Sequence, residues 1–251
     1  MTASMTAHDH RQPAVMKQQV LGAIRRGLRR GELSERDQAA LRDRLATHAR
    51  HLIPARSRVS RAQQIALFVA NVEKEYGTVA RVRHVTDIPA AVADYLASQN
   101  LAPEIVAAPH PEFGEIPWSE RPLLQIRKGR AGPADTVSFQ HGFAGIAETG
   151  TLMLPSGPER PTTLNLLAET EIVLLRTSRI VGAYEEAWDL LRAKRGGGDA
   201  FMPRNVMLVT GPSRSADIEQ ALELGAHGPR RLHVVLIADD PDEAPSGDHP
   251  A

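Results

Sequence analysis

The chain has 251 residues, with 30 basic and 30 acidic side chains, 10 histidines and no cysteine. This neutral balance argues against nucleic-acid binding through bulk charge. The absence of thiols excludes disulfides, cysteine nucleophiles, thiolate zinc sites and cysteine-ligated iron–sulfur clusters on this chain. The sequence shows no signal peptide and no apolar run of the roughly twenty residues that a membrane helix needs. We therefore expect a cytoplasmic protein with one α/β domain, extensions and no membrane span.

Residues 1–57 are expected to form a helical, arginine-rich extension. Apolar residues recur with helical spacing over 16–28, and a second short helix is expected over 34–51. From residue 11 to residue 61 there are thirteen basic and four acidic side chains. We interpret this excess either as a solvated helical face or as a docking surface for an acidic partner, centred on Arg25–Arg30.

Residues 58–238 alternate between strand-like and helix-like patterns, and residues 239–251 form an acidic tail that we expect to be disordered. The alternation predicts a mixed, mostly parallel sheet flanked by helices, with closely spaced strands over 144–154, 163–167 and 171–175 as a β-meander or hairpin insert. The remaining expected strands are 78–82, 104–107, 123–126, 136–139, 205–209 and 233–238. The expected helices are 58–76, in which Ser60 is a candidate N-cap, 87–98, 182–195 and 215–224.

The first turn that suggests a ligand site follows an apolar run and contains Glu148, Thr149, Gly150 and Thr151. Glycine lets a backbone approach a ligand closely, and small hydroxyls suit a polar or anionic molecule. A carboxylate here can be a base, a nucleophile or an acceptor for backbone amides. The catalytic and the turn-stabilising interpretations of Glu148 both stay open.

The second such turn follows the expected strand 205–209 and leads into the expected helix 215–224. Its backbone N–H groups and the helix dipole favour an anion, which Arg214 would neutralise. The alternative to an anion site is that these residues only cap the start of the helix and bind no ligand. The spacing matches neither a Walker loop nor a dinucleotide-binding loop. The candidate ligand-binding residues here are Thr210, Gly211, Ser213, Arg214, Ser215 and Asp217.

Ligands of open parallel sheets bind beyond the carboxyl ends of the strands. We therefore expect the Glu148–Thr151 and Gly211–Asp217 turns to face each other across a cleft at that edge. His141 and His227 each lie beside a glycine, and each is either a proton shuttle or polar surface. No grouping of His, Asp and Glu along the sequence has metal-ligand spacing, so no metal site is expected.

Four sequence segments resemble segments of a known protein family and occur in the same order along the chain. They are Ile146–Leu152, Met202-Pro-Arg, Thr210–Glu219 and Leu224–His233. The chain resembles the LUD-domain family, and most closely its lactate utilization protein C (LutC/YkgG) members. The resemblance implies a fold like that of the sugar-phosphate isomerase and CoA-transferase superfamily. It also implies a place in a bacterial three-subunit system that oxidises L-lactate to pyruvate, with iron–sulfur clusters on two cysteine-rich partner subunits.

One departure from the family pattern is Glu171, which stands where the family usually has a histidine before a strand. Two interpretations of the function of this chain remain open. The first is a cluster-free subunit that binds a small carboxylate or its partner subunits. The second is a stand-alone isomerase-, acyl-transfer- or ligase-type enzyme that uses Glu148. The missing cysteines and the basic N-terminal helices favour the first.

Overall fold

The computed structural model describes residues 12–29, 31–195, 202–215 and 223–239. The chain divides into two compact units, Met1–His51 and Leu52–Ala251. The first unit contains α1 (Gln12–Gly27) and α2 (Glu35–Thr47). The α2 helix begins where Ser34 Oγ accepts a hydrogen bond from the Asp37 backbone N–H at 3.1 Å. No residue of α2 is buried.

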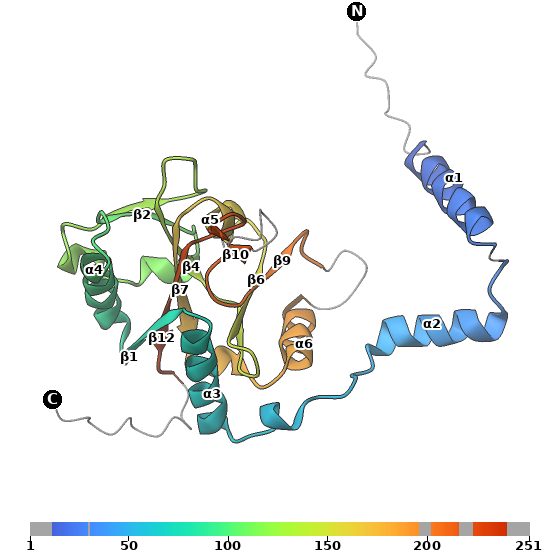
Figure 1. Cartoon of the computed structure of the whole chain (residues 1–251), viewed down its shortest axis with the longest axis horizontal. Coiled ribbons are helices and arrows are strands. Elements are labelled where there is room, and N and C mark those ends of the chain that lie inside the picture. The colour runs from blue at the N-terminus through green and yellow to red at the C-terminus, as the bar shows by residue number, and fades with distance from the viewer. Residues whose placement is uncertain (1–11, 30, 196–201, 216–222, 240–251) are drawn as a thin grey trace, which may run out of the picture. The chain divides into compact units, whose positions relative to one another are not determined.

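The second unit is built on a six-stranded sheet in which every pair of neighbouring strands is parallel (Figure 1). In spatial order its strands are β1 (Thr78–Val82), β12 (Arg231–Ile237), β7 (Thr170–Arg176), β4 (Val137–His141), β2 (Glu104–Ala107) and β3 (Gln125–Lys128). The central strands β12, β7 and β4 are buried on both faces, so their polar side chains, such as Ser138 and Gln140, are buried with the apolar ones. The predicted α/β fold class is confirmed.

One face of this sheet packs against α4 (Ile88–Ser98), whose Pro89 lies in the first turn. The other face packs against α3 (Arg61–Lys74). Ser60 caps α3 in a reciprocal capping box with Gln63, as its sequence position predicts. Single 3-10 turns connect the larger elements: η1 (Ala55–Ser57), η2 (Val85–Asp87), η3 (Pro111–Gly114), η4 (Trp118–Glu120) and η5 (Thr177–Arg179).

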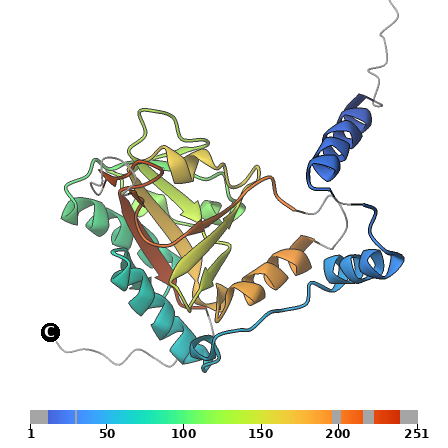
Figure 2. The ribbon, with the colours of Figure 1, turned by 45° about the vertical axis from the view of Figure 1, so that its right-hand side comes forward.

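A second sheet covers the α3 side of the first sheet. Its four strands, in spatial order, are β8 (Ile180–Val181), β5 (Ala144–Ile146), β6 (Thr151–Pro155) and β9 (Val206–Val209). Residues of its outer face, such as Ile146 and Met153, pack against α6 (Tyr184–Arg195). Figure 2 shows α6 beyond this sheet. Of the predicted β insert, residues 144–154 therefore contribute two strands to a separate sheet, whereas residues 171–175 lie in β7 of the parallel sheet.

Two predicted elements are wrong. Residues 163–167, expected as a strand, contain the short helix α5 (Thr163–Leu166), because a four-residue Thr-Leu-Asn-Leu alternation cannot distinguish strand from helix. The helix expected over 215–224 is also wrong, because the described residues at its two ends lie in strands. There β10 (Arg214–Ser215) pairs antiparallel with β11 (Glu223–Leu224). Residues 216–222 lie outside the described residues.

The path of the chain creates a switch point between β2 and β4. After β2 the chain continues to β3 on one side, whereas after β4 it reaches β7 on the other side. Ligands of open parallel sheets bind where the connections of adjacent strands diverge in this way. A functional site is therefore expected at the carboxyl ends of β2 and β4. Among the described residues, no helix is both long and apolar enough to cross a membrane.

Candidate functional site at the switch point

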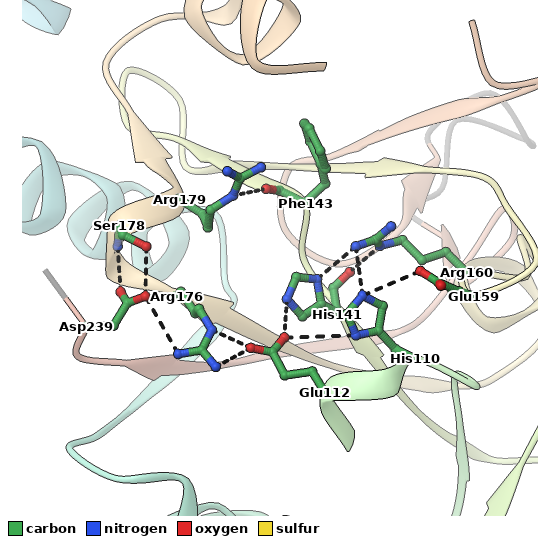
Figure 3. A network of polar contacts seen from close by, with 10 residues as sticks. All are labelled: His110, Glu112, His141, Phe143, Glu159, Arg160, Arg176, Ser178, Arg179 and Asp239. Atoms are coloured by element: carbon green, nitrogen blue, oxygen red, sulfur yellow. Dashed lines mark hydrogen bonds and ion pairs between the residues drawn. The ribbon is translucent and has the colours of Figure 1, made fainter. Parts of the chain in front are cut away.

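Polar side chains gather at the switch point from segments far apart in the sequence (Figure 3). His141 is the last residue of β4, and Arg176 is the last residue of β7. His110 and Glu112 lie just after β2, in and before the turn η3. Arg160 reaches the same place from the loop that follows β6. We call these five residues the switch-point cluster.

Glu112 lies at the centre of the switch-point cluster. Its Oε2 accepts a hydrogen bond from His141 Nε2 at 2.6 Å, and its Oε1 accepts from the guanidinium of Arg176. The His141 hydrogen bond, followed by Arg176, lowers the pKa of Glu112 to about 2. Glu112 is therefore an anion at neutral pH, held between an imidazole and a guanidinium.

The two imidazoles of the switch-point cluster are stacked, with ring centroids 4.3 Å apart and planes at 8°. Burial, followed by the charges of His141 and Arg160, lowers the pKa of His110 to about 4. Burial also lowers the pKa of His141, although Glu112 opposes this shift. Both rings are therefore neutral at pH 7, and each offers one lone pair.

Arg160 fixes which ring nitrogens carry those lone pairs. Its Nη2 lies 3.3 Å from His110 Nε2 and 3.1 Å from His141 Nδ1, and its Nε donates to the His141 carbonyl at 3.2 Å. Because a guanidinium only donates, the nitrogens that face it accept. His141 therefore keeps its proton on Nε2, toward Glu112. This arrangement gives a base oriented by a carboxylate, beside a cation.

Donor atoms of His110, Glu112 and His141 also lie within 4.8 Å of one another, as the ligands of a metal ion would. A metal-bound imidazole normally donates its outer N–H to an acceptor. Here Arg160, a donor, faces the outer nitrogen of His141. The arrangement fits a hydrogen-bonded network better than a metal centre. The three residues come from two strand ends, so sequence spacing gave no sign of this group.

The residues predicted to bind a ligand lie at the opposite edge of the parallel sheet. The hydroxyls of Thr149, Thr151, Thr210 and Tyr184 form one hydrogen-bonded cluster, with Thr151 Oγ1 2.7 Å from Thr210 Oγ1. The two turns are thus neighbours, as predicted. Their predicted place at the carboxyl edge is wrong, because Gly150 and Gly211 pack against the C-terminal part of α3, which leads into the start of β1.

Both turn glycines serve a close backbone approach. Gly150 has φ +66°, and a Cβ there would lie 2.6 Å from the backbone N of Val72. Gly211 has φ +68°, and a Cβ there would lie 2.2 Å from the carbonyl O of Glu75. Any L side chain would be strained in this conformation and would clash with α3. The sequence correctly indicated close approach, but the neighbour that the structure shows is a helix.

Glu148 is buried beside the start of α6. Its Oε1 accepts a hydrogen bond from the Tyr184 backbone N–H at 3.3 Å, and its Oε2 lies 3.6 Å from Arg56 Nη2. A carboxylate at a helix N-terminus satisfies free amides and suits the helix dipole. These contacts match the stabilising interpretation of Glu148 that the sequence left open beside the catalytic one.

The second turn lines a cavity of about 320 Å³ that also includes Asn165 and Glu171. Thr210, Gly211, Ser213, Arg214 and His227 all border it. Arg214 forms an ion pair with Glu75 at 2.7 Å and stacks over Tyr76, Ser213 Oγ accepts from the His227 backbone N–H at 3.2 Å, and Ser215 lies in β10. Asp217 lies outside the described residues.

Comparison with known proteins finds similarity over part of the chain. Residues 136–237 match the LUD domain. The chain is 42% identical over 104 residues to the uncharacterized protein NMB1437 of Neisseria meningitidis, a match that covers 41% of this chain and 43% of that protein. It is 36% identical over 94 residues to lactate utilization protein C of Bacillus licheniformis, covering 38% and 39%. With YkgG of Escherichia coli it shares 35% identity over 103 residues, covering 41% and 44%.

These matches span less than half of each relative. Among solved structures, a DUF162 family protein from Deinococcus radiodurans superposes with a TM-score of 0.52 at 20% identity. That alignment covers 71% of this chain and 99% of the other, and it supports the fold alone. The resemblance stated from sequence motifs is confirmed over the LUD domain.

Proposed function

We propose, from the premise that residues 136–237 form a LUD domain like that of lactate utilization protein C, that this protein serves in lactate utilization. In this proposal the chain binds a small α-hydroxy carboxylate at the switch-point cluster. It works with two cysteine-rich iron–sulfur subunits that take up the electrons. The observation that carries the proposal is the contact of one guanidinium with two neutral imidazoles beside an ionised carboxylate.

The chemistry of an α-hydroxy acid matches these groups. The ligand carboxylate pairs with the guanidinium of Arg160, which is suited to planar carboxylate recognition. The ligand hydroxyl then donates to Nδ1 of His141, in the place that Arg160 now occupies. Glu112 orients this imidazole through Nε2 and stabilises any positive charge that develops on it. The chain thus binds and orients the acid, and no redox step takes place on its own residues.

The N-terminal helices supply the proposed contact with partner subunits. In α1 and just after it, Val20, Ile24 and Leu28 have 50–60% of their surface exposed. Arg25 and Arg26 lie in the last turn of α1. Exposed apolar side chains next to arginines suit a partner surface with an apolar groove and acidic rim. We propose that this surface holds the chain in the lactate-oxidising complex.

Titration calorimetry with L-lactate tests the ligand site. The native chain should bind L-lactate, and propionate, which lacks the hydroxyl, should bind more weakly. Arg160→Gln should weaken L-lactate binding by about 1.5–3 kcal/mol, the order of a charged hydrogen bond. Arg83→Gln is a matched control, because Arg83 is exposed just beyond β1, three strands away from β4 in the sheet. Unchanged binding by Arg160→Gln would refute the site.

The role in a complex needs a separate test. The purified chain should not oxidise lactate, whereas the chain with its two partner subunits should reduce a dye in a lactate-dependent way. His141→Gln should slow this reaction and leave assembly intact. Robust lactate oxidation or another turnover by the chain alone, lost in Glu148→Gln, would favour the stand-alone enzyme instead.

A further inference from the structure

A cavity of about 570 Å³ lies beside the switch-point cluster and shares Arg160 with it. Three loops form its walls: the residues after β3, the loop after β6 and the residues before β9. Its described lining residues are Arg130, Ser156, Gly157, Pro158, Arg160, Pro161, Thr162, Thr163, Met202, Pro203, Arg204 and Asn205. We call this the arginine cavity. Cavities of roughly 300–1,000 Å³ hold metabolite- or drug-sized molecules, so a lactate-sized acid leaves most of it unfilled.

The charge of the arginine cavity is one-sided. Three arginines line it, and none of its described lining residues is acidic. Arg160 contacts a carbonyl and two neutral imidazoles. The side chains of Arg130 and Arg204 are exposed and form no hydrogen bond or ion pair with the described residues. Glu159, next to Arg160 in sequence, turns toward His110 Nε2 at 3.8 Å.

Hydroxyl groups in the wall have protons left to donate. Ser156 Oγ accepts a hydrogen bond from the Asn205 backbone N–H at 3.0 Å, and Thr163 Oγ1 accepts from the Ala131 backbone N–H at 3.2 Å. Each hydroxyl accepts one hydrogen bond in this way and donates none to a described residue, so its own O–H is available for a ligand. Guanidinium groups and hydroxyl donors together match the oxygens of a phosphate group.

The apolar part of the cavity wall favours a ligand that carries an apolar group beside its phosphate. Pro158, Pro161, Pro203 and Met202 line the same cavity, and Met202 has half of its surface exposed. We propose that the arginine cavity binds an organic phosphate, with the phosphate between Arg130 and Arg204 and the organic group against Met202 and the prolines. This site is additional to the lactate site, and its ligand is larger and more highly charged than lactate.

Calorimetry with two probes tests this proposal: inorganic phosphate, which carries only the charge, and phenyl phosphate, which adds an apolar group. Phenyl phosphate should bind more tightly than inorganic phosphate. The double variant Arg130→Gln/Arg204→Gln should weaken phenyl phosphate binding at least tenfold, and Arg83→Gln should not change it. The double variant should fold normally, because both side chains are exposed and make no described contacts.

Three results would overturn the proposal. They are no phenyl phosphate binding by the native chain, equal affinity for the two probes, or unchanged binding in the double variant. L-lactate binding separates this proposal from the proposed function. It should stay within twofold in the double variant, and its loss there would show that these arginines belong to the lactate site and would overturn the inference. Loss of lactate binding in Arg160→Gln alone leaves the phosphate test unaffected.

Discussion

Replacing Glu171 by glutamine should remove a large part of the pH dependence of stability. Glu171 lies near the start of β7 and is fully buried. Its Oε1 accepts hydrogen bonds from Gln140 and, at 2.9 Å, from Asn165. Its Oε2 has no hydrogen-bond partner among the described residues. Burial raises the pKa of this carboxyl to about 8, against the opposing effect of the two amides.

The sign and size of the effect follow from proton linkage. The unfolded chain releases this proton near pH 4.5, whereas the folded chain keeps it up to about pH 8. The free energy of unfolding is therefore highest below pH 4.5 and falls as pH rises to about 8. The slope is at most about 1.4 kcal/mol per pH unit, so the total loss is at most about 5 kcal/mol. Glutamine keeps the shape and the acceptor oxygen but cannot ionise.

Urea unfolding at several values between pH 5 and pH 9 measures this effect. The stability of Glu171→Gln relative to the native chain should increase by several kcal/mol across this range. Glu169→Gln is the control, because Glu169 is exposed two residues away and its substitution should give a constant difference. Comparing variants cancels the other titrating groups. A difference between Glu171→Gln and the native chain that does not change with pH would show that folding does not raise the pKa of Glu171.

Three further predictions concern other parts of the chain. Burial lowers the pKa of His233 to about 4, so the free energy of unfolding should fall as pH falls from 6.5 to 4, and His233→Phe should reduce this loss. Urea unfolding over this pH range measures the effect, and an equal loss of stability in both proteins would count against it. Gly150→Ala should lower the free energy of unfolding by about 2–4 kcal/mol, because the left-handed backbone and the contact with α3 both oppose a Cβ; a thermal melt like that of the native chain would contradict this. Reversing the charges of Arg26 and Arg29 should weaken assembly with the partner subunits, most at low salt, and co-purification at native yield would disprove it.

Many helices and strands could be predicted because the residues that start, end or pattern each of them lie close together in the sequence. The strand 78–82 follows the helix-ending Gly77, and 104–107 is a short apolar run after Pro103, and both were predicted at their observed bounds. Helix α3 was recognisable from the cap at Ser60 and its apolar stripe. The segment 163–167 was too short for its period to decide between strand and helix.

The candidate site was only partly predictable, because it depends on strand order. His141 was considered as a proton shuttle, but nothing near it in sequence indicates a partner. Its contact with Glu112 exists because β2 and β4 are neighbours, and Arg176 joins because β7 is next to β4. Polar residues directly after expected strands were the available signal. Residues 109–121 have neither a helical nor a strand pattern, so nothing in that segment placed His110 and Glu112 beside His141.

A crystal structure of the chain with L-lactate bound would locate the ligand site. The lactate carboxylate should lie against the guanidinium of Arg160, and its hydroxyl should lie within hydrogen-bond distance of His141 Nδ1. Glu112 should keep its hydrogen bond to Nε2 of the same ring. Lactate bound instead in the cavity beside Glu171 and the Gly211 turn, with the switch-point cluster unchanged, would show that the switch-point cluster is not the lactate site.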